Sequence, residues 1–247
     1  MTNDALTKFD ANVPEFLRGK KDDNRGTGHF RQEDIQIPRL SIAQALSPEQ
    51  LDDDPKQIEG LKLGEMFNSL TKENYHQGPI EFFVLKAAPP RGVEFIPREQ
   101  GGGIKDRDVP LTDPRMQWRG DKQPIATLFY DYVILMSITK EIVALSMKGT
   151  NIKVAKNFNG LIAMRKQAIF AGKYSISCVK EKNNKGTYGV FQVDNAGWCS
   201  EDEYPELEKL FDQFAIKEIV IHSEEEEAEL PLEKDGMPLK EDGSPAF

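Results

Sequence analysis

Apolar residues are concentrated in the middle of the chain. Pro79–Ala88 and Thr127–Ser137 are rich in aromatic and β-branched residues, and Glu141–Lys148 continues this pattern after a short polar connection. Runs of this kind, bounded by Pro, Gly and polar residues, are typical of β-strands. Residues 97–123 between them are long, polar and glycine-rich, which predicts an insertion between strands.

The second half of the chain alternates between two periodicities. Asn151–Gln167 has apolar residues at helical spacing, whereas Lys173–Lys182 and Thr187–Asp194 are strand-like and flank a polar turn. Gly186 in that turn favours a β-hairpin. Ser200–Phe214 begins with Ser and carries Glu203 three residues later, the spacing of a helical capping box. Ala215–Ile221 is predicted as a last edge strand.

The order of these elements predicts a mainly β (α+β) fold. Short antiparallel strands with one interposed helix suit an OB-like antiparallel barrel, followed by one C-terminal helix. We expect a flexible N-terminal arm over residues 1–33, one domain over 34–221 that contains the polar insertion 97–123, and a disordered acidic tail over 222–247.

The charge of the chain is segregated. The net charge is −9, but residues 222–247 hold nine acidic residues against two lysines and so account for −7 of it. Residues 140–185 hold ten cations against two acidic residues, a net charge of +8. A basic segment followed by an acidic one favours a protein that binds a polyanion. The alternative is a lysine-rich solvated surface followed by a solubilising end.

The predicted hairpin is the main candidate for a nucleic-acid site, because lysines neutralise phosphates and rings stack on unpaired bases. An indole between two arginines in the insertion, Trp118, either stacks on a base or anchors its own loop. The candidate nucleic-acid-binding residues are Lys148, Lys153, Lys156, Arg165, Lys166, Lys173, Lys180, Lys182, Lys185, Tyr174, Tyr188, Phe191 and Trp118.

Other classes of site have no matching pattern. The glycines of the insertion lack the GxxxxGK[ST] pattern of a phosphate loop, and no nucleophile elbow is present, so we expect no enzyme and no cofactor. The two cysteines and three histidines do not form a metal-ligand pattern, and we expect reduced thiols. No run is long enough to span a membrane, and the polar N-terminus lacks a signal-peptide core, so we expect a cytoplasmic protein.

The run VKEKNNKGTYGVFQV, the segment SEDEYPELEKLFDQF and the end SPAF resemble the single-stranded DNA-binding proteins of tailed phages. The resemblance covers about residues 34–247. It implies an OB barrel that coats unpaired DNA without strong sequence preference in replication or recombination. It also implies that the acidic tail covers the basic surface in the absence of DNA and otherwise recruits replication or recombination proteins. The residues implied in partner binding are Glu224, Glu225, Glu226, Glu227, Asp242 and Phe247.

Two other classes remain open. A phage virion or assembly protein would use its acidic tail to dock on a basic neighbour and would have no affinity for DNA. A replication or transcription adaptor would bind protein first and DNA weakly. The sequence also leaves open a homo-oligomer, the preference for DNA or RNA and the identity of the partner protein.

Overall fold

The computed structural model describes residues 37–216 except 53, 98, 99, 101, 121 and 185. The expected arm 1–33, the tail 222–247 with its partner-binding residues, and Lys185 lie outside the described residues. The chain divides into two compact units. Of the described residues, 37–90 and 129–216 belong to the first unit and 91–128 to the second.

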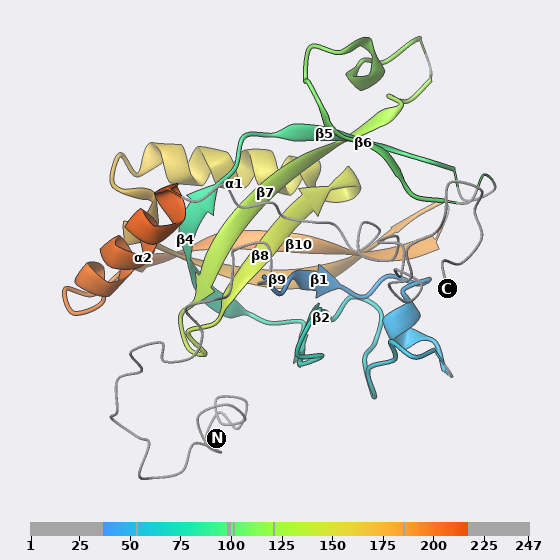
Figure 1. Cartoon of the computed structure of the whole chain (residues 1–247). Helices are drawn as coiled ribbons and strands as arrows, with labels where there is room; N and C mark the ends of the chain where they lie inside the picture. The colour runs from blue at the N-terminus through green and yellow to red at the C-terminus, as the bar shows by residue number, and fades with distance from the viewer. Residues whose placement is uncertain are drawn as a thin grey trace, which may run out of the picture. The chain divides into compact units, whose positions relative to one another are not determined.

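The first unit is built on an antiparallel sheet (Figure 1). Its strands run in the order β10-β9-β4-β7, and β8 pairs with the other edge of β7. Their bounds are β4 Ile80–Ala87, β7 Ala126–Met136, β8 Ile142–Lys148, β9 Gly172–Asn183 and β10 Gly186–Trp198. The mainly β prediction is therefore confirmed, and so is the hairpin, whose strands are both longer than expected.

One face of this sheet carries the main core. Alternate residues of a strand share a face, and Phe82, Tyr132 and Tyr174 are at most 2% exposed on the same side. Helix α1 (Ile152–Met164) covers them, with Phe158 4.9 Å from the Tyr174 ring and 5.1 Å from the Tyr132 ring. The helix connects β8 to β9.

The N-terminal part of the unit forms a small sheet in the order β1-β2-β3. Its strands are β1 Leu40–Ile42, β2 Met66–Asn68 and β3 Asn74–His76. Just before β1, Arg39 forms a parallel bridge with Ala144 of β8. Just after β1, the Gln44 side chain hydrogen-bonds Gly189 of β10. Among the described residues β8 and β10 do not pair directly. In place of the expected OB-like barrel, this part of the chain forms an open sheet whose edges are joined through the β1 segment.

Two predicted helix ends can be compared with the structure. The helix α2 (Tyr204–Ile216) has the predicted capping box, because Glu203 N–H donates to Ser200 Oγ at 3.2 Å and Ser200 N–H donates to Glu203 Oε2 at 2.9 Å. The strand predicted over Ala215–Ile221 is wrong at its start, which is helical, and its remainder lies outside the described residues.

The remaining elements are short. The 3-10 helices are η4 Pro48–Gln50, η7 Gly149–Asn151 and η8 Ile169–Ala171 in the first unit. The α2 helix packs on β4 and on η8, where the Phe170 ring lies 5.1 Å from Tyr204 and 5.2 Å from Phe211. The second unit contains the β-hairpin β5 (Arg91–Phe95) and β6 (Ile104–Val109), followed by η6 Pro114–Met116. The polar insertion predicted over 97–123 thus contains a strand that its composition did not indicate.

Candidate nucleic-acid interface

The outer end of the β9–β10 hairpin carries two of the predicted lysines. Lys180 pairs in register with Gly189, and Lys182 with Thr187. Both lysines are exposed, and both lie on the hairpin face that is buried further along at Cys178. The alternate positions of β9 that are apolar inside the core are therefore occupied by lysines beyond the edge of the core.

Helix α1 presents further lysines beside this hairpin. Its first turn is joined to β10 by a hydrogen bond from Phe191 N–H to Asn151 Oδ1, at 2.8 Å. Asn151 is the N-cap residue, and its side chain makes this contact instead of capping the helix. Lys153 and Lys156 lie on the exposed side of α1, and Lys166 follows the helix.

These lysines share the absence of an acidic partner. Among the residues that the structure describes, no ion pair or side-chain hydrogen bond involves Lys153, Lys156, Lys166, Lys180 or Lys182. Their charges are therefore available to an external anion. We call these residues the lysine set.

Two other predicted cations are used within the fold. The Arg165 guanidinium donates to Lys173 O at 3.1 Å, to Gly197 O and to Asn195 Oδ1. Lys173 lies 3.8 Å from Glu81 and 3.9 Å from Glu203, with its Nζ 5.3 Å from the Phe83 ring centroid. Both cations are therefore engaged by groups of the fold, and a role for either in nucleic-acid binding stays a prediction. Lys148 is half-buried, with its Nζ 5.2 Å from the Phe129 ring centroid.

The predicted aromatic residues separate by burial. Tyr174 is 1% exposed and Phe191 is 4% exposed, so both rings belong to the core and neither face is open to a base. Tyr188 is half-buried on the hairpin and donates to Glu181 Oε2 at 3.1 Å, a bond that raises the pKa of the tyrosine. Trp118 in the second unit is 64% exposed.

A second exposed indole was not predicted. Trp198 ends β10, is 52% exposed and stacks on the Arg165 guanidinium at 4.4 Å. The predicted strand ended at Asp194, and the irregular pairing between Asn195 and Gly197 hides the continuation to Trp198. In the sequence, the glycine at position 197 was the local signal of that irregularity, and in the structure Gly197 has a φ of +109°.

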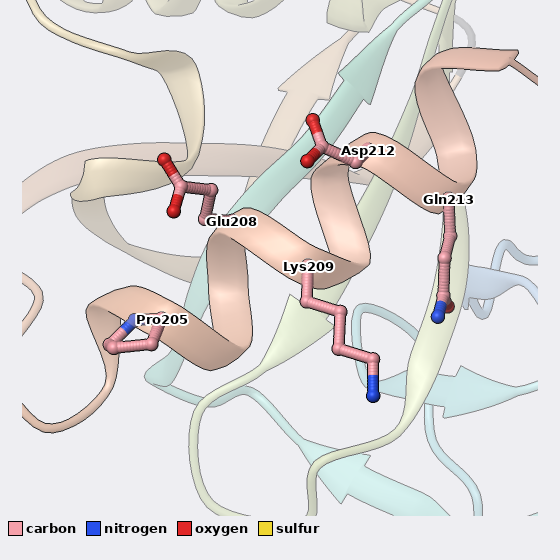
Figure 2. A pocket seen from close by; sticks show the side chains of 5 residues that line it. All are labelled: Pro205, Glu208, Lys209, Asp212 and Gln213. Carbon is pink, nitrogen blue, oxygen red and sulfur yellow. The ribbon is translucent and has the colours of Figure 1, made fainter.

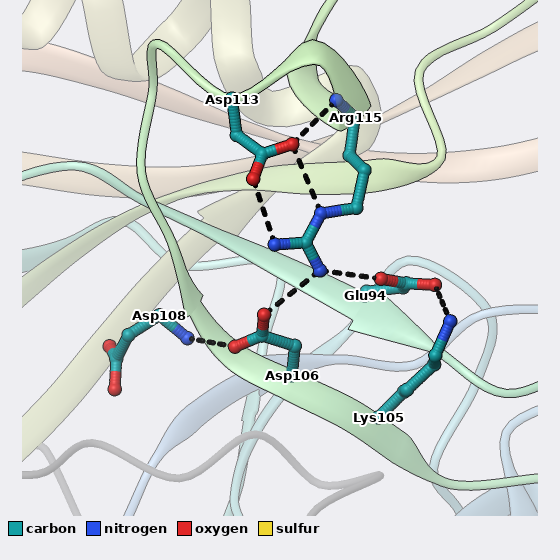
Figure 3. A network of polar contacts seen from close by, with 6 residues as sticks. All are labelled: Glu94, Lys105, Asp106, Asp108, Asp113 and Arg115. Carbon is teal, nitrogen blue, oxygen red and sulfur yellow. Dashed lines mark hydrogen bonds and ion pairs between the residues drawn. The ribbon is translucent and has the colours of Figure 1, made fainter.

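The second unit also contains an ion-pair network centred on Arg115, three residues before Trp118 (Figure 3). Arg115 reaches Glu94 at 2.7 Å, Asp106 at 2.9 Å and Asp113 at 2.9 Å, and Lys105 reaches Glu94 at 2.7 Å. Arg115 is thus committed to the loop and is not open to a phosphate.

The network changes the titration of its carboxyl groups. Hydrogen bonds from Arg115 lower the pKa of Asp113 to about 2 and lower that of Asp106. The hydrogen bond from Lys105 lowers the pKa of Glu94 most, and the hydrogen bond from Arg115 lowers it further. All three groups are therefore ionised at neutral pH. Beyond the network, Arg119 and Lys122 exchange backbone hydrogen bonds of 3.2 Å across a tight turn that follows Trp118.

A shallow depression of about 390 Å³ lies on α2 and has a different character (Figure 2). It is lined by Pro205, Glu208, Lys209, Asp212 and Gln213. Its two carboxylates outnumber its one cation, so it does not favour a phosphate. Among the described residues, no group of three or more His, Cys, Asp or Glu side chains could hold a metal ion.

Comparison with known protein families identifies a family for this chain. No curated protein and no solved structure matches this sequence. Within the described part of the chain, no helix is long and apolar enough to cross a membrane. The family of Pam3 phage gp34-like proteins matches residues 5–220, which is most of the chain. The protein therefore belongs to the Pam3 phage gp34-like family.

Proposed function

We propose that this phage-family protein binds single-stranded DNA without strong sequence preference during replication or recombination. The lysine set of α1 and the β9–β10 hairpin contacts the phosphates. The acidic residues 222–247 recruit replication or recombination proteins, and their aromatic end, Phe247, enters a pocket of the partner.

The observation that carries the proposal is that the cations of residues 140–185 fall into two groups, those with partners in the fold and those without. Arg165 and Lys173 interact with carbonyl and carboxylate groups of the fold. The lysine set has no such partner among the described residues and is exposed. Binding a phosphate backbone requires unpaired cations whose counterions are released on contact.

The connectivity of the sheet supports the same proposal. In OB-type proteins, oligonucleotides contact the loop between the fourth and fifth strands, among other surfaces. The corresponding loop is the tip of the β9–β10 hairpin, next to Lys182. The face of β7 and β8 that points away from α1 is less suitable for DNA because it is already covered. Asp131 on this face is 2% exposed and Ala144 is 1% exposed. The DNA path therefore follows the hairpin and α1 rather than that face. Trp118, in the second unit, is a separate candidate contact.

The test is fluorescence anisotropy of a labelled oligo-dT strand and a matched duplex, titrated at two salt concentrations. The full-length protein should prefer the single strand, and its affinity should fall steeply with salt. A truncated protein of residues 1–221 should bind more tightly at low salt, because it lacks the competing acidic segment. No binding by either protein at low salt would refute the proposal and favour a virion or assembly protein.

A further inference from the structure

Trp198 is an exposed aromatic residue on a fixed backbone. It pairs in register with Gly172, and the next residue donates its N–H to Ala171 O at 2.9 Å. Its side chain is nevertheless 52% exposed. A large apolar ring left open at the end of a well-paired strand loses burial energy that a core position would supply.

One face of the Trp198 ring is already occupied. The Arg165 guanidinium lies 4.4 Å from that ring and 4.6 Å from the Tyr174 ring. Tyr174 belongs to the core, so the three side chains form a stack that starts inside the fold and ends at the surface. Because Arg165 covers one face of the indole, a flat ligand would have to stack on the opposite face.

The middle layer of the stack is held in position. Arg165 donates to the carbonyl groups of Lys173 and Gly197 and to the Asn195 side chain. The orientation of the indole is therefore set before any ligand arrives. A ring fixed in advance loses little conformational entropy on binding, which favours stacking of a flat ligand.

The charges near Trp198 are mixed rather than basic. Lys166 follows Arg165 and is exposed, but Glu201 and Asp202 are exposed just after Trp198. Glu203 is engaged by Ser200, at 2.9 Å, and by Lys173. The acidic residues disfavour a phosphate at this place. An uncharged, planar group with a π-face fits better.

We infer that Trp198 stacks on one unpaired base of the bound single strand, as the outer layer of the Tyr174–Arg165–Trp198 stack. This inference rests on the proposed function. The phosphates are bound by the lysine set, and Trp198 adds an interaction that is independent of counterion release. Its contribution to affinity is therefore the same at low and high salt.

The chain has two tryptophans, so each can be observed alone. Full-length Trp118→Phe leaves Trp198 as the sole indole, and full-length Trp198→Phe leaves Trp118. Oligo-dT should quench the Trp198 emission with the same midpoint that anisotropy of the labelled strand gives. Trp198→Ala should weaken binding by about tenfold at both salt concentrations, the size expected of one stacked base. Trp198→Phe should lose less, because a ring remains.

The outcomes separate the two proposals. Strand binding by anisotropy without quenching of Trp198 would overturn this inference and leave the proposed function intact. Absence of binding by the unmodified protein would refute the proposed function and this inference with it. Since Trp198→Ala also removes a packing partner of Arg165, the fluorescence of Trp118→Phe is decisive, because Trp198 stays in place there.

Discussion

The side-chain amide of Gln44 pairs with both backbone polar groups of Gly189. Gln44 Nε2 donates to Gly189 O at 3.0 Å, and Gly189 N–H donates to Gln44 Oε1 at 3.0 Å. The Gln44 side chain therefore satisfies the two backbone groups that a neighbouring β-strand would otherwise pair with. Since Arg39 also bridges to Ala144, one short segment protects both edges of the sheet. Exposed edges would otherwise be templates for association with other chains.

The close approach at this junction predicts a sensitive glycine. A Cβ at Gly189 would lie 2.5 Å from Ile42 Cγ2 and 3.1 Å from the Cα of Gly64. Gly189→Ala should therefore push the β1 segment away from β10 and lower the free energy of unfolding by about 1–3 kcal/mol. Urea unfolding would measure this change, and an unchanged midpoint would contradict the described packing.

The matched glycine-to-alanine control has the opposite sign. Gly160 lies inside α1, and a Cβ there would meet no atom within 4 Å. Gly160→Ala should raise the free energy of unfolding by about 0.5–1 kcal/mol, because alanine is the better helix former. The same urea experiment checks it, and destabilisation would show that the exposed side of α1 is not open.

Removal of lysines from the hairpin should change the salt dependence of DNA binding. Lys180→Ala with Lys182→Ala should weaken oligo-dT binding and reduce the log–log salt slope by about 1.4, which is two contacts at about 0.7 each for a single strand. Lys56→Ala with Lys209→Ala is the control, because it removes the same charge from exposed positions outside the lysine set. Equal effects of both pairs would indicate general charge attraction only.

Arg165 allows a test of structural against electrostatic roles. Arg165→Lys keeps the positive charge but loses the forked geometry that reaches Gly197 O, Lys173 O and Asn195 Oδ1. We expect the free energy of unfolding to fall by about 1–3 kcal/mol because carbonyl groups lose their donors. Thermal unfolding, with a repeated scan to check reversibility, would measure it. Unchanged stability would show that the fold does not need these bonds and would favour Arg165 as a phosphate contact.

The Arg115 network predicts loosening of the second unit in acid. Its carboxyl groups have pKa values below their ordinary range, so their ionised forms stabilise the fold. The stabilisation is complete only above about pH 5, beyond the ordinary pKa of glutamate, and is lost as pH falls toward about 2, the pKa of Asp113. Trp118 emission in Trp198→Phe should report this transition. Arg115→Gln should loosen the unit already at neutral pH and flatten the profile.

The two thiols should differ in reactivity. Burial raises the pKa of Cys178 to about 11, whereas Cys199 is only half-buried. Since the thiolate is the reactive form, iodoacetamide should modify Cys199 first in the native protein and both cysteines in urea. Peptide mass spectrometry would measure the order. Early modification of Cys178 would mean that β9 opens readily.

Local patterns in the sequence predicted the elements whose contacts are local. The capping box of Ser200 and Glu203, the helix after Asn151 and the hairpin around Gly186 all depend on residues a few positions apart. Their periodicity and turn chemistry are visible without any knowledge of the fold.

The site could be predicted less well, because burial and pairing are decided by distant residues. The charge of Arg165 gave no sign of its acceptor Gly197, which lies 32 positions further along the chain. The aromatic side chain of Tyr174 suggested a residue that stacks on bases, but Phe158 of α1 covers it. Trp198 was missed because one irregular pair shifts the strand register just before it.

The junction of Gln44 and Gly189 also sets when folding can be completed. The two residues are 145 positions apart, so the N-terminal segment must wait for nearly all of the described chain to be synthesised before it finds its partner. Pairing over such a separation is slow, because the chain loses the conformational entropy of loop closure before the contact stabilises the fold. Until then the edges of β8 and β10 are uncovered. At high concentrations of the nascent chain, this interval is when misassembly competes with folding.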